Sequence, residues 1–153
     1  MQTVALNLDV YSDAQAADKL IASTFTQAGA EYLVMAGYMR MVGPAVLSAY
    51  EDRVINLHPA LLPSFKGAHA IQDAFDFGVK VTGVTVHFAN AEYDKGPIIA
   101  QHPAILHEDE TVDTLEARIH EVDHDLYPWV LRHLAAGDIT IDPTTRTVHV
   151  ANA

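Results

Sequence analysis

The sequence predicts an α/β fold in which a mostly parallel, twisted sheet is flanked by helices. Short apolar runs typical of buried strands alternate with segments whose apolar residues recur at helical spacing, and this alternation is the pattern of α/β proteins. The chain has 153 residues, 50% of them hydrophobic, which is enough to build one core. No internal repeat or Pro/Gly/Ser-rich linker interrupts it. We therefore expect a single domain over residues 1–153.

The first half of the chain is expected to contain three helices and two strands. Ser12-Asp13 is a helix-start signal, and the apolar residues after it share one face as far as Gly29. Two short apolar runs, each closed by a glycine or a proline, have the character of buried strands. In order, we expect a helix over 12–28, a strand over 32–36, a short helix over 43–50, a strand over 53–58, a loop over 59–68 and a helix over 69–77.

The second half is expected to contain two more strands, a long helix and a tail. Residues 82–88 alternate and are rich in Val and Thr, as strands are. A polar loop over 90–96 separates them from a strand over 97–106. The apolar stripe over 111–136 predicts one long helix, which Pro128 should kink or interrupt. The tail, 138–153, contains a turn signal and is expected to form a hairpin.

The composition limits the classes of function. Nine Lys and Arg residues against twenty Asp and Glu give a formal net charge of −11, whereas nucleic-acid binding requires a basic footprint. The absence of cysteine excludes disulfides, iron–sulfur clusters and thiol catalysis. No apolar run reaches bilayer length, and the N-terminus lacks the regions of a signal peptide. We expect a soluble, cytoplasmic protein that binds neither nucleic acid nor a membrane.

The densest group of chemically useful residues is Asn56-Leu57-His58-Pro59. Alternate residues of a strand point to the same face, so Asn56 and His58 should lie together while Leu57 faces the core. In open α/β sheets, ligands bind beyond the carboxyl ends of strands. An amide donor beside an imidazole suits acyl transfer, because one can stabilise an oxyanion and the other can move a proton. The alternative is a hydrogen-bonded pair that finishes a strand, which is the commoner role of an isolated Asn-x-His.

Asp94 is the second candidate for a catalytic role. It lies in the polar loop, just before Gly96 and the next strand. A carboxylate beside His58 would raise the pKa of the imidazole and fix its tautomer. The alternative is an aspartate that caps its own turn, as is common in Asp-x-Gly. Spacing alone does not join Asp94 to His58.

The long helix contains one motif that is typical of a metal site. The run from His120 to His124 has the letters His-Glu-x-x-His, and its two histidines are four residues apart, a spacing that can chelate zinc. A third ligand is not evident downstream. We therefore expect a structural or substrate-binding role for this run and no metal.

Arg40 is charged within the otherwise apolar segment 38–42. Such a side chain can simply reach solvent. A guanidinium can also bind a carboxylate ligand with two parallel hydrogen bonds, so Arg40 is a candidate for binding an anionic ligand.

Taken together and in this order, the motifs resemble the glycinamide ribonucleotide formyltransferase family, over about residues 4–137. The resemblance rests on six stretches of sequence. They are Met35-Ala36-Gly37-Tyr38-Met39-Arg40, Ile55-Asn56-Leu57-His58-Pro59-Ala60-Leu61-Leu62-Pro63, Gly67-Ala68-His69, Gly83-Val84-Thr85-Val86-His87-Phe88, Asp94-Lys95-Gly96-Pro97-Ile98-Ile99 and His124-Asp125-Leu126-Tyr127-Pro128.

The resemblance implies transfer of a formyl group from 10-formyltetrahydrofolate, the cosubstrate, to the amine of glycinamide ribonucleotide in purine biosynthesis. Asn56 would donate to the oxyanion, His58 would donate a proton, and Asp94 would keep the pKa of the imidazole raised. By the same resemblance the folate would be bound by Met39, Arg40, Met41, Val42, Asn56, Asn90, Ala91, Glu92, Tyr93 and Asp94. The ribonucleotide would be contacted by His120, Glu121, Val122 and Asp123.

The sequence also departs from the family pattern. The glycine- and serine-rich phosphate loop and the strands around it have no counterpart, and we expect an apolar sheet edge near residues 32–36 to be uncovered as a result. Lys66 stands where a proline is common, and Asp123 stands where a glutamate is usual.

These departures keep two alternative functions open. One is formyltetrahydrofolate hydrolysis, although that related family typically has a second histidine where this chain has Pro59. The other is an inactive folate-binding remnant that lacks the phosphate site. A homodimer is possible, because an uncovered apolar edge favours association.

Overall fold

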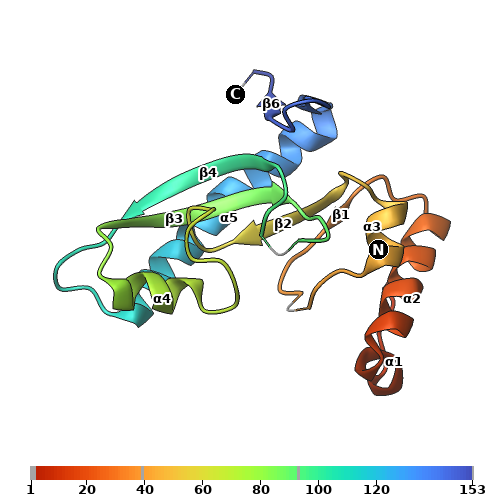
Figure 1. Ribbon diagram of the computed structural model, residues 1–153, viewed down its shortest axis with the longest axis horizontal. Coiled ribbons are helices and arrows are strands. Elements are labelled where there is room, and N and C mark those ends of the chain that lie inside the picture. The colour runs from red at the N-terminus through yellow and green to blue at the C-terminus, as the bar shows by residue number, and fades with distance from the viewer. Residues whose placement is uncertain (1–2, 39, 93, 153) are drawn as a thin grey trace.

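The computed structural model describes residues 3–38, 40–92 and 94–152 (Figure 1). Helices and strands alternate through most of this length. Their order is α1 (Leu8–Ser12), α2 (Ala14–Gln27), β1 (Leu33–Val34), α3 (Pro44–Ala49), β2 (Val54–His58), α4 (Ala70–Phe77), β3 (Val81–Phe88), β4 (Ile98–Ile105), α5 (Val112–Ala136), β5 (Ile139–Ile141) and β6 (Val148–Val150).

The central sheet has four strands in the order β1-β2-β3-β4, and the α/β class expected from the sequence is confirmed. The sheet is mixed, because β1 pairs parallel to β2 whereas β2–β3 and β3–β4 pair antiparallel. The parallel character that we expected of the sheet is therefore confined to the β1–β2 pair. The connection between β3 and β4 is too short for the crossover that a parallel pair requires.

The strand expected over residues 32–36 is shorter in the structure and covers only Leu33–Val34. It pairs with β2 on one side, and the side chains of Tyr32 and Val34 are exposed. Gly37 then turns the chain with a φ of 68°. A strand paired on one side has half of the usual hydrogen bonds. The apolar run 32–36 therefore forms a strand over two residues only.

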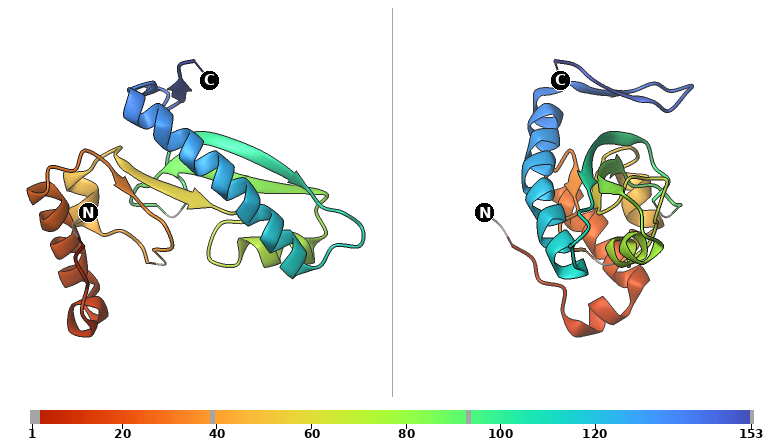
Figure 2. Two further views of the ribbon diagram at one scale, coloured as in Figure 1. Left: turned by 180° about the vertical axis from the view of Figure 1, so that it is seen from behind. Right: turned by 90° about the vertical axis from the view of Figure 1, so that its left-hand side faces the viewer.

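Helix α5 covers one face of the sheet along most of its length (Figure 2). The expected apolar stripe provides the buried side chains of this layer. Ile119 belongs to one core cluster with Val84 of β3, and Val130 belongs to another with Ile55 of β2. Ile55 therefore faces α5. Its neighbours on β2, Asn56 and His58, face the opposite side of the sheet.

The helix runs unbroken from Val112 to Ala136 although Pro128 lies inside it. The interruption that we expected there does not occur. Proline removes the hydrogen bond to the carbonyl of His124, four residues earlier, and His124 is exposed, so water can satisfy that carbonyl. Gly137 ends the helix in the left-handed conformation at φ 78°.

The last strands, β5 and β6, form an antiparallel hairpin beside the end of α5 (Figure 1). Arg146, in the turn of this hairpin, makes a two-pronged ion pair with Asp52, which precedes β2. Among the described residues, no helix is long and apolar enough to cross a lipid bilayer.

Candidate active site

The register between β2 and β3 brings four polar side chains together. Asn56 pairs with His87, and His58 pairs with Thr85. Since β2 turns Asn56 and His58 away from α5, the paired His87 and Thr85 share that face. Strand pairing alone therefore places two imidazoles and a carboxamide side by side on the face opposite α5.

His58 is 4% exposed and both of its ring nitrogens face oxygen atoms. Nε2 lies 2.8 Å from the carbonyl oxygen of Phe65, and Nδ1 lies 3.4 Å from Oδ2 of Asp94. A carbonyl and a carboxylate can only accept hydrogen bonds. Both nitrogens can donate at once only when the ring carries two protons.

Asp94 reaches His58 from the loop between β3 and β4. The residue adopts a φ of 50°, a conformation that aspartate tolerates better than most residues. Its Oδ2 accepts a hydrogen bond from the backbone N–H of Gly67 at 3.0 Å. The carboxylate therefore bridges two loops, and it is 7% exposed.

Gly96 allows this loop to close. A Cβ at that position would lie 1.6 Å from the carbonyl oxygen of Phe88, which is backbone and cannot move aside cheaply. The close approach keeps residues 94–96 against the end of β3.

His87 completes the group. Its Nδ1 lies 3.0 Å from the carbonyl oxygen of Phe88, and its Nε2 lies 3.2 Å from Nδ2 of Asn56. Because a carbonyl only accepts, Nδ1 carries the proton in the neutral ring, and Nε2 accepts from the amide of Asn56. Burial lowers the pKa of His87, although the hydrogen bond to Phe88 and the charge of Asp94 oppose this effect. A neutral His87 thus fixes which way the Asn56 amide points.

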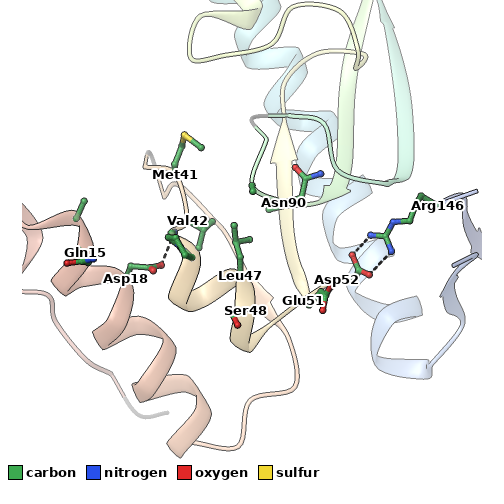
Figure 3. Close-up of a pocket in the computed structure, with 15 residues that line it drawn as sticks. Gln15, Asp18, Met41, Val42, Leu47, Ser48, Glu51, Asp52, Asn90 and Arg146 are labelled. Atoms are coloured by element: carbon green, nitrogen blue, oxygen red, sulfur yellow. Dashed lines mark hydrogen bonds and ion pairs between the residues drawn. The ribbon is translucent and has the colours of Figure 1, made fainter. Parts of the chain in front are cut away.

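Beside this cluster lies a cleft of about 60 Å³. It opens next to a larger cavity of about 950 Å³, which runs from α2 across α3 to Arg146 (Figure 3). Most residues expected to bind the folate line one or both. The cleft is lined by Arg40, Met41, Val42, Asn56, Asn90, Glu92 and Asp94, and the cavity by Met41, Val42, Asn90 and Ala91. Met39 and Tyr93 lie outside the described residues.

Arg40 has partners of its own within the chain. The guanidinium lies 4.5 Å from the centre of the Tyr11 ring and donates to the Tyr11 carbonyl oxygen. Arg40 therefore holds the residues before α2 against the 38–43 segment, in addition to lining the cleft. A cation stacked on an aromatic ring is favoured by the negative face of that ring.

The four residues expected to contact the ribonucleotide lie in the middle of α5, and they differ in burial. Asp123 is 9% exposed, Val122 is half-buried and packs in the core, and His120 and Glu121 are exposed. Nδ1 of His120 lies 3.3 Å from Oδ2 of Asp123.

Asp123 has two unusual properties. Its Oδ1 is buried and has no hydrogen-bond partner among the described residues. Burial raises the pKa of its carboxyl group, although His120 opposes this effect. An unsatisfied buried oxygen costs free energy, and such a cost is typical of a group that awaits a ligand.

Tyr127 shows where this part of α5 faces. One helical turn beyond Asp123, its hydroxyl donates to the carbonyl oxygens of Met35, at 2.7 Å, and Ile55, at 3.2 Å. Residues four apart lie on the same helix face. Asp123 therefore faces the same region as Tyr127, near the carboxyl end of β1. His120 and His124 do not converge on a metal cluster, and no such cluster occurs among the described residues.

Comparison with known proteins decides the family. The formyl transferase family matches residues 2–131 of this sequence. The chain belongs to the formyl transferase family. The membership expected from the sequence motifs is therefore confirmed.

Relatives within this family carry consistent names. Phosphoribosylglycinamide formyltransferase from Bacillus subtilis is 47% identical over 104 residues, which is 68% of this chain and 53% of that protein. The protein of the same name from Mycobacterium tuberculosis is 42% identical over 118 residues, 77% of this chain and 55% of that protein. The chain spans about half the length of the curated relatives it matches.

Solved structures of family members superpose closely. Glycinamide ribonucleotide transformylase 1 from Symbiobacterium toebii has a TM-score of 0.88 and 38% identity, and the match covers 95% of this chain and 68% of that one. A formyltetrahydrofolate deformylase from Pseudomonas syringae has a TM-score of 0.84 and 27% identity, covering 91% of this chain and 46% of that one.

The site of this family member contains groups that sequence reasoning did not select. His87 belongs to the motif over residues 83–88 without being predicted as a site residue. The available signal was its place two residues after Thr85, which puts both side chains on one face of β3. The Phe65 carbonyl could not be found from sequence, because a backbone atom of a loop carries no signature.

Proposed function

We propose that this chain transfers a formyl group from 10-formyltetrahydrofolate to the amine of glycinamide ribonucleotide, the reaction of purine biosynthesis for which its relatives are named. The observation that carries the proposal is the buried contact of His58 with Asp94, next to the Asn56 amide. In acyl transfer to an amine, an amide donor can stabilise the oxyanion, and an imidazole held by a carboxylate can move a proton.

The proposed reaction proceeds by addition and elimination. The amine nitrogen attacks the formyl carbon, and the carbonyl oxygen becomes an oxyanion that the amide of Asn56 and the protonated ring of His58 stabilise. The bond from carbon to N10 of the folate then breaks. The amine loses one proton and N10 gains one, so His58 passes a proton without net consumption.

Asp94 acts through His58 in this scheme. Its carboxylate stabilises the charged ring and holds Nδ1 in place, while Gly67 fixes the carboxylate. We propose that a substrate oxygen takes the position against Nε2 that the Phe65 carbonyl occupies in this structure.

For the folate we propose the cleft and the cavity beside it. Met41, Val42 and Asn90 line both, which supports one ligand that extends across the two. Most of this lining is apolar or carries amide groups, as is typical of sites for flat heterocycles. Tyr93 and Met39 remain predictions of the sequence.

For the acceptor we propose Asp123 and His120. A partly charged amine is attracted to the free Oδ1 of Asp123, which has no partner among the described residues. The surroundings of Asp123 on α5, near the carboxyl end of β1, support contact with the nucleophile. Glu121 and Val122 flank it and remain predicted contacts.

Hydrolysis of formyltetrahydrofolate is the second candidate. It is favoured by the structural likeness to a deformylase, and it needs only water in place of the amine. Pro59, directly after His58, disfavours hydrolysis, since the related hydrolase family typically has a second histidine at this position.

The test mixes the protein with 10-formyltetrahydrofolate, with and without glycinamide ribonucleotide, and follows both products. Formyl transfer predicts that the ribonucleotide gains a formyl group, seen by mass spectrometry, at the rate at which tetrahydrofolate appears. Free formate at the same rate with or without acceptor would identify a hydrolase. Folate binding without either product would identify a binding protein.

We also propose a cytoplasmic location and a homodimer. The exposed Tyr32 and Val34 at the free edge of β1 support self-association. Sedimentation velocity over a range of concentrations tests this expectation, and a monomer throughout would contradict it.

A further inference from the structure

Asp18 is a buried carboxylate far from the catalytic cluster in sequence, and it lines the larger cavity but not the cleft beside that cluster. It lies on α2 and is 7% exposed. Its Oδ1 accepts hydrogen bonds from the backbone N–H of Gly43, at 2.8 Å, and of Val46, at 3.4 Å. Its Oδ2 accepts from the N–H of Ala45 at 2.7 Å. One side chain of α2 therefore caps the start of α3 (Figure 3).

This cap satisfies the free N–H groups of α3 completely. A helix begins with donors that have no partner inside it. Here Pro44 has no N–H, Leu47 donates to the carbonyl of Gly43, and Asp18 accepts from the rest. Since α3 has only six residues, and isolated helices so short are unstable in water, its position depends on this contact.

The absence of a side chain at Gly43 allows this contact. A Cβ on Gly43 would lie 2.5 Å from Cγ and Oδ2 of Asp18. Its φ of −89° is one that any residue adopts, so the glycine serves the close approach and not an unusual backbone. Asp18 and Gly43 therefore form a lock between α2 and α3, which we call the Asp18–Gly43 lock.

The lock holds one wall of the proposed folate site. Met41 and Val42 directly precede Gly43 and line both the cleft and the cavity. Leu47 and Ser48, in the helix that Asp18 caps, line the same cavity. Moving the start of α3 would move all four side chains.

We propose that Asp18 is a positioning residue for folate binding. It touches no reacting atom, and it acts by fixing the segment 41–48 through the Asp18–Gly43 lock. This inference rests on the proposed function. It predicts that damage to the lock weakens folate binding and leaves the chemical step on β2 and β3 nearly intact.

The test compares Asp18→Ala, Asp18→Asn and Gly43→Ala with a matched control. Thr111 also caps a helix, accepting from the backbone N–H of Thr114 at the start of α5, and it is exposed. Neither residue lines the cavity, so Thr111→Ala removes a helix cap without moving the wall. Thermal unfolding confirms that each variant is folded at the assay temperature.

For Asp18→Ala and Gly43→Ala we expect KM for 10-formyltetrahydrofolate to rise by about tenfold, with kcat within about twofold of the original protein. Asp18→Asn keeps one acceptor oxygen and should rescue part of the loss. Thr111→Ala should leave KM unchanged. An equal rise of KM in Thr111→Ala, or unchanged KM in Asp18→Ala, would overturn the inference.

Failure of the proposed function has a different signature. In that case the unsubstituted protein would show no turnover and no folate binding by calorimetry. Amide hydrogen exchange then tests the Asp18–Gly43 lock independently of activity. Faster exchange at the amides of Gly43, Ala45 and Val46 in Asp18→Ala supports it, and unchanged exchange overturns it.

Discussion

The two sides of the central sheet, the β2–β3 strand pair and the β1–β2 strand pair, are built differently. Between β2 and β3, four residue pairs fix the register, α5 covers one face, and His58, His87 and Asp94 of the polar cluster on the other face are buried. Between β1 and β2, only two pairs form, and Val34 is 44% exposed. Strand pairing thus positions the catalytic candidates, whereas the ligand wall beside β1 depends on side-chain contacts such as the Asp18–Gly43 lock.

This difference suggests a division of labour. The groups proposed to transfer protons and stabilise charge lie where displacement costs most, because a rigid support is what catalysis by preorganised groups requires. The groups proposed to bind the folate lie on loops and on a six-residue helix, where adjustment to a ligand is cheaper. The predictions below test each side of the comparison.

The largest loss of stability is expected from Gly96→Ala. The new Cβ would collide with the backbone of Phe88, so the loop that contains Asp94 must shift. We expect the free energy of unfolding to fall by about 2–4 kcal/mol, together with loss of turnover. Lys95→Ala, next to it and exposed, should change stability by less than about 0.5 kcal/mol. Equal stability of the two variants in urea unfolding would contradict the proposed loop geometry.

His87→Leu tests the orientation of Asn56. Removing the acceptor Nε2 leaves the amide without the partner that aligns it, and we expect kcat to fall by about tenfold with little change in KM. His102→Leu is the control, because His102 is an exposed histidine on the adjacent strand β4. Steady-state kinetics test this prediction. A rise in KM with unchanged kcat would contradict it and would assign His87 to substrate binding.

Asp123→Asn should stabilise the fold while impairing activity. Burial raises the pKa of Asp123, so its ionised form destabilises the folded state at neutral pH. The asparagine variant should melt a few degrees higher at pH 7. This difference in melting temperature should shrink as the pH falls through the raised pKa. It should vanish below 3.8, the ordinary aspartate value, where Asp123 is protonated in both the folded and the unfolded state. Asp125→Asn, exposed on the same helix, should show no such pH dependence. If both variants gave the same dependence of melting temperature on pH, the raised pKa assigned to Asp123 would be refuted.

The smallest effect is expected at the sheet edge. Val34 and Ile55 are register partners on β1 and β2, and the same substitution compares the two sides directly. Val34→Thr should change the free energy of unfolding by less than about 0.5 kcal/mol. Ile55→Thr, which places a hydroxyl in the core, should cost about 2–3 kcal/mol. Similar losses at both positions would remove the contrast between the two sides.

Much of the architecture could be predicted from sequence. The helices capped by Asp13, Thr111 and Gly137 carry strong local signals. The shared face of Asn56 and His58 follows from strand parity. These features depend on neighbours in the chain, and local patterns contain that information.

Other features could not be predicted, because they depend on contacts between distant segments. Asp94 meets His58 only because the β3–β4 loop folds back. Asp18 caps a helix that begins 26 residues later, so it has no local signature. The antiparallel pairing of β2 with β3 was also missed, since an intervening helix usually indicates a parallel crossover.

The most direct test of the central claim is the rate of acceptor-dependent formyl transfer in the original protein and in His58→Ala. We expect turnover that requires glycinamide ribonucleotide, reduced by about 10²–10⁴ in the variant, with the circular dichroism spectrum and folate affinity preserved. Unchanged transfer in His58→Ala would contradict the catalytic role assigned to the cluster of Asn56, His58 and Asp94.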